Sequence, residues 1–155
     1  MISIERIAAD GAIVMEEANR LFLEVFAHEG YHGPLPSRDH LVGLLADPKF
    51  IALVARIDGK MVGALAGYEL VKFEAERSEI YIYDLAVREE YRRRGVATAL
   101  IEAVKPIARD CGAWMIFVQA DPVDRPAVAL YEKLGAREEV LHFDISPAAG
   151  RSPRR

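Results

Sequence analysis

The stretch from Ile80 to Leu100 constrains this chain more than any other part of its sequence. Its β-branched and aromatic residues predict a strand over Ile80–Val87. Apolar residues spaced by three and four then predict a helix that opens at Gly95, and these residues are Val96, Leu100, Ala103, Val104 and Ile107. A strand that passes through a short charged turn into a helix is therefore the unit around which the rest of the chain has to fold.

The turn between this strand and this helix has the composition of an anion-binding site. Its small residues, Gly95 and Ala97, leave the first turn of the helix open to approach. The N–H groups of that turn have no partner inside the helix, and the helix dipole adds partial positive charge there. Arg92, Arg93 and Arg94 place three cations beside them. The pattern therefore predicts that the turn binds a phosphate or a pyrophosphate.

Two sequence blocks resemble the GNAT superfamily of N-acetyltransferases. The spacing R-x-x-G-x-A that begins at Arg92, after a strand that ends at Val87, is similar to the acyl-coenzyme A loop of that superfamily. The block PAVALYEKLGA from Pro126 is similar to its C-terminal helix. More narrowly, SEIYIYDLAV, VQAD, PAVALYEKLG and REEVLHFDI resemble the type I aminoglycoside 3-N-acetyltransferases, and this likeness covers Lys49–Ile145.

The predicted elements follow the order β-α-α-β-β-β-α-β-α-β, which indicates an α/β (α+β) fold with helices on both faces of a mixed sheet. Asp58-Gly59 predicts a tight hairpin. The resemblance implies a twisted, mostly antiparallel sheet with a splayed central cleft. The apolar run Trp114–Gln119 predicts a central strand that is buried on both faces. Arg137–Ile145 is predicted to be the last strand.

Length and composition predict one acetyltransferase domain over residues 1–145 and a disordered tail over residues 146–155. The single cysteine forms no internal disulfide and is typical of a reducing compartment. Because no leader pattern and no membrane-spanning stretch is present, we expect a cytoplasmic protein without a membrane partner. The four histidines show no metal-ligand spacing, so we expect no metal site.

The charge balance favours a cationic partner. Of the 20 basic residues, Arg151, Arg154 and Arg155 lie in the tail, which leaves 17 basic against 24 acidic side chains before it. Such a balance argues against nucleic acid as a partner and is compatible with a polycationic one.

The resemblance implies how acetyl-CoA would bind. The backbone of Leu85, Ala86 and Val87 would pair with the pantetheine arm as if the arm were another strand, and an N–H near Leu85 would polarise the thioester carbonyl. The pyrophosphate would lie against the turn and the first helical residues, namely Arg92, Arg93, Arg94, Gly95, Val96, Ala97 and Thr98.

Asp84 is the most informative side chain of the strand. Strict alternation places it on one face with Ile80, Ile82 and Ala86, where a buried carboxylate is costly without a partner or a β-bulge. The resemblance implies a bulge that would turn Asp84 into the cleft, where it could hold a substrate ammonium and take its proton. The alternative is that Asp84 makes only a structural hydrogen bond at the bulge.

Tyr131 matches the family tyrosine that faces the coenzyme sulfur and serves as the general acid. A phenol with a pKa of about 10 is protonated at neutral pH and can donate to a thiolate. Without the resemblance, a tyrosine between Leu130 and Leu134 is more often a core residue. The acidic residues that could contact a cationic substrate besides Asp84 are Glu79, Asp121 and Asp144.

The resemblance therefore implies an acetyl-CoA-dependent enzyme that acetylates the 3-amino group of an aminoglycoside antibiotic by direct transfer in a ternary complex, and that confers resistance. Two alternatives stay open. The acceptor could be another polycationic amine, such as a polyamine or a peptide amine, or the chain could be a non-catalytic acyl-CoA-binding module. A homodimer is expected from the resemblance alone.

Overall fold

The computed structural model describes residues 1–27 and 33–150. The chain divides into two compact units, Met1–Gln119 and Ala120–Arg155. The single acetyltransferase domain expected over residues 1–145 stays a prediction. The predicted tail lies partly outside the described residues, as does much of the loop between the first two helices.

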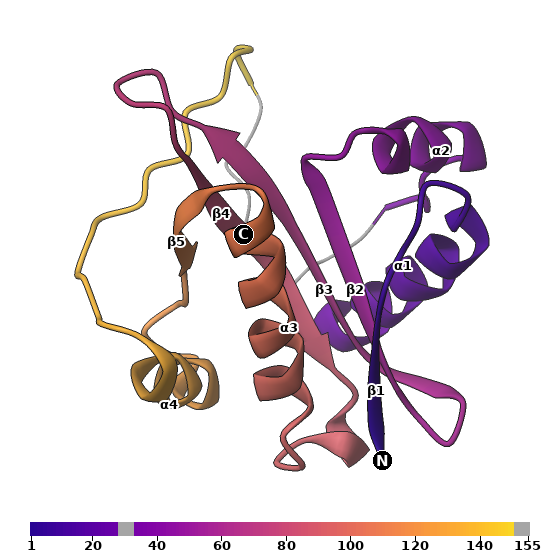
Figure 1. Cartoon of the computed structure of the whole chain (residues 1–155). Helices are drawn as coiled ribbons and strands as arrows, with labels where there is room; N and C mark the ends of the chain where they lie inside the picture. Colours follow the sequence, from indigo (N-terminus) through magenta and orange to yellow (C-terminus); the bar gives the residue numbers. More distant parts are fainter. Residues whose placement is uncertain (28–32, 151–155) are drawn as a thin grey trace. The chain divides into compact units, whose positions relative to one another are not determined.

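The first unit is a five-stranded sheet with helices on both faces (Figure 1). The strands lie in the order β1-β2-β3-β4-β5, and all neighbours are antiparallel except β4 and β5, which are parallel. The mixed, mostly antiparallel sheet is thus confirmed. The elements are β1 (Ile2–Arg6), α1 (Ala12–Phe26), α2 (Arg38–Ala46), β2 (Phe50–Ile57), β3 (Lys60–Val71), β4 (Ser78–Val87), the short 3-10 helix η2 (Glu89–Tyr91), α3 (Val96–Asp110) and β5 (Ala113–Val118).

Alternate residues of the strands form two apolar layers. One layer packs with α1 and α2 and includes Phe50, Ala64, Ala66 and Ala86. The other lies on the face covered by α3, whose buried residues include Val96 and Leu100. At Gly63 the sheet and this helix approach closely, because an added Cβ would lie 2.9 Å from the side chain of Val96. These contacts fix the start of α3 against the end of β4.

A β-bulge interrupts β4 opposite Gly67. Ala66 pairs with Asp84, but Gly67 pairs with Ile82, so Tyr83 is the extra residue. Gly67 makes this geometry possible, because a Cβ at that position would lie 2.6 Å from the carbonyl oxygen of Tyr81. The bulge predicted beside Asp84 is therefore confirmed, and a glycine of the neighbouring strand accommodates it.

We expect Gly67→Ala to destabilise the protein by about 1–3 kcal/mol, because the methyl group has to displace backbone of β4. Gly43→Ala is the matched control. Gly43 lies within α2 and nothing is within 4 Å of its added Cβ, so this change should stabilise the protein by about 0.5–1 kcal/mol. Urea unfolding of both variants measures the difference. Equal effects of the two substitutions would contradict the close approach at the bulge.

The prediction of a central strand over Trp114–Gln119 is wrong. β5 is an edge strand of the sheet, and the Trp114 side chain is 69% exposed. The guanidinium of Arg77 lies 5.1 Å from the centroid of its ring. An apolar run shows which residues can be buried, but burial on both faces also requires neighbouring elements, and the run carries no information about those.

The second unit contains one helix, α4 (Arg125–Leu134), among its described residues. The predicted cap is confirmed, since the carboxylate of Asp124 accepts a hydrogen bond from the Ala127 N–H at 3.2 Å. The predicted strand over Arg137–Ile145 is wrong, because this segment has no regular secondary structure. Alternating side chains favour a strand only when a neighbouring strand takes up the backbone hydrogen bonds, and here the apolar set remains exposed: Val140, Leu141, Phe143 and Ile145.

Within the described residues, no helix is both long enough and apolar enough to cross a membrane.

Candidate active site

The turn from β4 to α3 has the geometry of an anion site. Gly95 precedes the first residue of α3 with a left-handed backbone (φ 81°), and an added Cβ there would have nothing within 4 Å. No side chain from the described residues 1–27 and 33–150 caps this helix end, and its first turn holds no acidic residue. The first-turn N–H groups of Val96, Ala97 and Thr98 are thus left for an external acceptor.

The three arginines of the turn take different positions. Arg92 donates from Nε to the carbonyl oxygen of Val87 at 3.3 Å, which ties the turn to the end of β4. Arg93 has a left-handed backbone (φ 60°). The guanidinium of Arg94 and the ammonium of Lys60 each lie 5.2 Å from the ring centroid of Tyr91. A cluster of cations therefore lies beside the open helix end.

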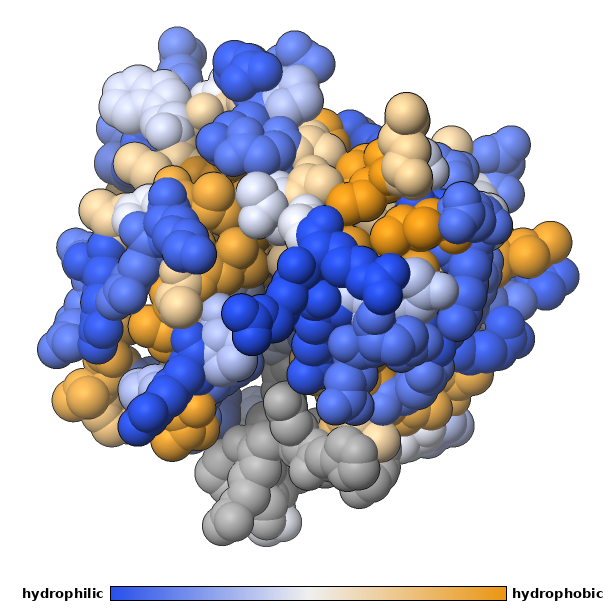
Figure 2. All heavy atoms as spheres, turned by 90° about the horizontal axis from the view of Figure 1, so that it is seen from below, coloured by the Kyte–Doolittle hydropathy of each residue, from blue (hydrophilic) through white to orange (hydrophobic). Residues whose placement is uncertain are grey.

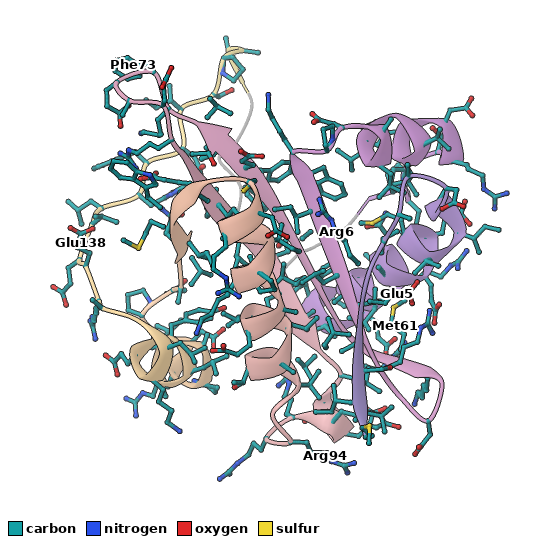
Figure 3. The ribbon with its side chains drawn as sticks, viewed as in Figure 1. Glu5, Arg6, Met61, Phe73, Arg94 and Glu138 are labelled. Atoms are coloured by element: carbon teal, nitrogen blue, oxygen red, sulfur yellow. The ribbon has the colours of Figure 1, made fainter. Side chains whose placement is uncertain are left out.

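Figure 3 labels Arg94, which marks the end of the sheet where this turn lies. Figure 2 views the molecule from that end and shows hydrophilic residues gathered in the middle of the face. The residues of the turn fit a pyrophosphate by their charge, by their unpaired N–H groups and by the open space at Gly95.

Among the described residues, the last part of β4, from Leu85 to Val87, pairs with a strand on one side only. The parallel pairing with β5 ends at Ile82 and Val118, whereas the antiparallel pairing with β3 continues to Val87. The backbone of Leu85 and Val87 is therefore not paired with β5 on that side. Such an edge can take up an extended chain by hydrogen bonds of the β type, as the predicted pantetheine contacts require.

The bulge brings Asp84 to the sheet face that carries α1 and α2. Asp84 lies opposite Ala66, which belongs to the apolar layer of that face. Ile80 and Ile82 are fully buried on the other face. Asp84 therefore does not share a face with Ile80 and Ile82, as the predicted bulge implies, because the extra residue Tyr83 offsets the alternation. Asp84 is half-buried, and aromatic side chains lie near its carboxylate.

Three tyrosine rings lie close together on the sheet face that carries Asp84. The ring of Tyr83 lies 6.1 Å from that of Tyr68 and 5.5 Å from that of Tyr81, both centroid to centroid. Burial raises the pKa of Tyr68, and the charges of Asp84 and Tyr83 raise it further. These tyrosines are not among the site residues predicted from the sequence. The alternation of Tyr81 and Tyr83 with Ile80 and Ile82 was the available signal, because it separates two aromatic residues from two aliphatic ones.

The other predicted acidic residues have partners in their own units. Glu79 accepts a hydrogen bond from Arg77 at 2.7 Å in the first unit. In the second unit, Asp121 accepts from the Val123 N–H at 3.2 Å, and Asp144 lies 3.0 Å from Nε2 of His142. The fold thus brings Asp84 and Glu79 onto one strand, whereas Asp121 and Asp144 belong to the second unit.

Tyr131 lies in the second half of α4 and is half-buried. Burial raises the pKa of its phenol, and the charge of Asp124 raises it further. The hydroxyl therefore stays protonated throughout the neutral range, as a proton donor must.

Solved structures similar to this chain include two aminoglycoside acetyltransferases from uncultured soil metagenomic samples. The first is 50% identical, with a TM-score of 0.91, over 96% of this chain and 99% of the other. The second, solved in complex with sisomicin, is 34% identical, with a TM-score of 0.88, over 95% and 97%.

The curated relatives are matched over shorter stretches. An N-alpha-acetyltransferase of Saccharolobus solfataricus is 42% identical over 59 residues, which are 37% of this chain and 35% of the relative. A thialysine N-epsilon-acetyltransferase of Sus scrofa is 33% identical over 62% of this chain and 61% of the relative. The chain spans 35% to 42% of the length of the first relatives that it matches.

Residues 13–136 match the acetyltransferase (GNAT) family, whose members use acetyl-CoA. This match covers the helix α1, the bulged strand β4, the anion-binding turn and the helix α4. The chain therefore belongs to the GNAT family of acetyltransferases.

Proposed function

We propose that this acetyltransferase transfers the acetyl group of acetyl-CoA to the 3-amino group of an aminoglycoside and thereby confers antibiotic resistance. The observation that carries the proposal is the position of Asp84. The bulge places the carboxylate of Asp84 on the same face of the sheet as the tyrosine rings. Asp84 also directly precedes the part of β4 that is paired on one side only. A carboxylate among aromatic rings suits a cationic amine. The similarity to two aminoglycoside acetyltransferases supports the choice of substrate class.

The turn from Arg92 to Thr98 holds the pyrophosphate in this proposal, and the backbone from Leu85 to Val87 holds the pantetheine arm. Acetyl-CoA supplies the acetyl group as a thioester when it is bound. Asp84 orients the substrate ammonium and accepts its proton, directly or through water, so that the amine can attack. No side chain forms a covalent bond with the acetyl group.

Tyr131 donates a proton to the departing thiolate in this proposal. The raised pKa keeps the phenol protonated at neutral pH, so that a proton is available as the bond between carbon and sulfur breaks. Glu79, Asp121 and Asp144 provide further negative charge for the remaining ammonium groups of the acceptor.

The proposed function is tested by measuring thiol release from acetyl-CoA with sisomicin, spermidine and a peptide that has a free α-amine. We expect the highest kcat/KM with sisomicin, and NMR of the product should show the acetyl group on the 3-amino nitrogen. Faster transfer to spermidine or to the peptide would contradict the proposal. Coenzyme binding without thiol release in the presence of any amine would identify a non-catalytic module.

A second candidate function is the acetylation of another amine, such as the α-amine of a peptide. The matches to N-alpha-acetyltransferases and to the thialysine enzyme favour it. The same carboxylate and the same turn would serve it, so the panel of amines decides between the two candidates.

Tyr131→Phe should lower kcat by roughly 100-fold and leave the affinity for acetyl-CoA nearly unchanged, because it removes only the hydroxyl group that donates the proton and keeps the ring. Steady-state kinetics and calorimetry measure the two effects. Because the pKa of Tyr131 lies above its usual value of about 10, kcat of the wild type should show no loss from this group below that pH. Equal losses of turnover and coenzyme affinity would make Tyr131 a binding residue instead.

A further inference from the structure

Five aromatic rings form a continuous row across four strands of the first unit. The row begins at Phe50 on β2, whose ring centroid lies 5.5 Å from that of Tyr68 on β3. It continues through Tyr83 and Tyr81 on β4 and ends at Phe117 on β5, which stacks on Tyr81 at 4.7 Å with an interplanar angle of 6°. All five rings lie on the face that also carries Asp84.

The middle of this row is not core. Phe50 is buried, but the side chains of Tyr68 and Tyr83 are 39% and 43% exposed. Exposed aromatic rings that form one connected set are a candidate binding surface. The row thus runs from the buried ring of Phe50 to more exposed tyrosine rings. The three tyrosines Tyr68, Tyr83 and Tyr81 form the aromatic platform.

The platform is also held in place. The hydroxyl of Tyr81 donates to Oε1 of Gln119 at 2.8 Å, and its ring stacks on Phe117. Tyr83 then meets both Tyr81 and Tyr68 with tilted or edge-on rings, an arrangement that favours fixed positions. A tyrosine that is fixed before binding loses little conformational entropy when a ligand covers it.

We propose that Tyr68, Tyr83 and Tyr81 bind the sugar rings of the acceptor while Asp84 holds its reactive amine. Faces of aromatic rings attract ammonium groups and accept the apolar faces of sugars, so a row of them matches a chain of aminated rings. The bulge supports these two roles together, because it places Tyr83 and Asp84 at consecutive positions on one face. This inference rests on the proposed function and defines the acceptor as an oligosaccharide-like amine.

Tyr83→Leu should raise the KM for sisomicin about 5- to 30-fold, because it removes the aromatic face and keeps an apolar side chain. We expect kcat to stay within about twofold. Calorimetry should show the same loss of sisomicin affinity and an unchanged affinity for acetyl-CoA. Tyr83→Phe should restore binding, because it restores the ring. Tyr68→Leu provides a second variant at a different position of the row, in case the first does not fold.

Phe73→Leu is the matched control. Phe73 is an aromatic residue of the β3–β4 hairpin, is 98% exposed, and lies at the far end of the hairpin from Arg94 (Figure 3). Its substitution should change neither the KM nor the affinity for sisomicin. If Tyr83→Leu and Tyr68→Leu fold and behave like this control, the platform is contradicted and the proposed function stands. A wild-type protein that neither binds nor acetylates sisomicin would overturn the proposed function and the platform with it.

Discussion

Asp84→Asn should lower kcat/KM for an aminoglycoside by about 100- to 10,000-fold, the range that is typical when a positioned base is removed. Asparagine keeps the shape of the side chain and its ability to form hydrogen bonds, but it carries no charge and accepts no proton. Coenzyme affinity should be nearly unchanged, because the proposed pyrophosphate contacts lie beyond the end of β4. Steady-state kinetics and calorimetry on one preparation measure both.

The structural alternative predicts a different pair of results. If Asp84 only stabilises the bulge, Asp84→Asn should lower the melting temperature and leave the turnover of the folded protein close to that of the wild type. Asp110→Asn, at the exposed end of α3, is the control for removing one carboxylate from this unit. A stable and fully active Asp84→Asn variant would exclude the proposed base.

Gly95→Asp should weaken acetyl-CoA binding far more than Gly95→Asn does. Both side chains have the same size, and both residue types tolerate the left-handed backbone of this position better than others do. Only aspartate adds a negative charge at the helix start, where it would repel the pyrophosphate. A repulsion of this kind corresponds to about a 10- to 1,000-fold loss for charges a few ångströms apart.

Calorimetric titration with acetyl-CoA tests this difference. Gly112 offers a matched pair of controls, since it also has a left-handed backbone (φ 75°) and open space at its Cβ, but lies beyond the other end of α3. Gly112→Asp and Gly112→Asn should bind acetyl-CoA alike. Similar affinities of Gly95→Asp and Gly95→Asn would mean that the pyrophosphate lies elsewhere.

Local signals in the sequence predicted the first unit well. Asp58-Gly59 predicted a hairpin, and both residues have positive φ between β2 and β3. Gly95 predicted the start of a helix and lies one residue before α3. Such signals succeed because a left-handed turn or a helix end depends on a few adjacent residues.

Errors arose where an element depends on what lies beside it. Trp114 and its neighbours were predicted to be buried, yet edge position is a property of the whole sheet. Arg137–Ile145 alternates like a strand, yet it has no regular secondary structure. In the candidate site, the face of Asp84 depends on a close approach at Gly67, a residue of another strand. The row of aromatic rings likewise depends on four strands, β2 to β5.

The bulge also divides β4 into two halves of opposite parity. Before Tyr83, even-numbered residues such as Ile80 and Ile82 are buried on one face, and after it the even-numbered Asp84 and Ala86 belong to the other face. Deleting Tyr83 would turn the bulge into regular pairing, with Ile82 opposite Gly67 and Asp84 still opposite Ala66, so the later residues would keep their faces and only the bend beside Asp84 would be lost. A transplanted version of this site therefore has to carry the extra residue and its facing glycine together, since the bend that aims Asp84 needs both.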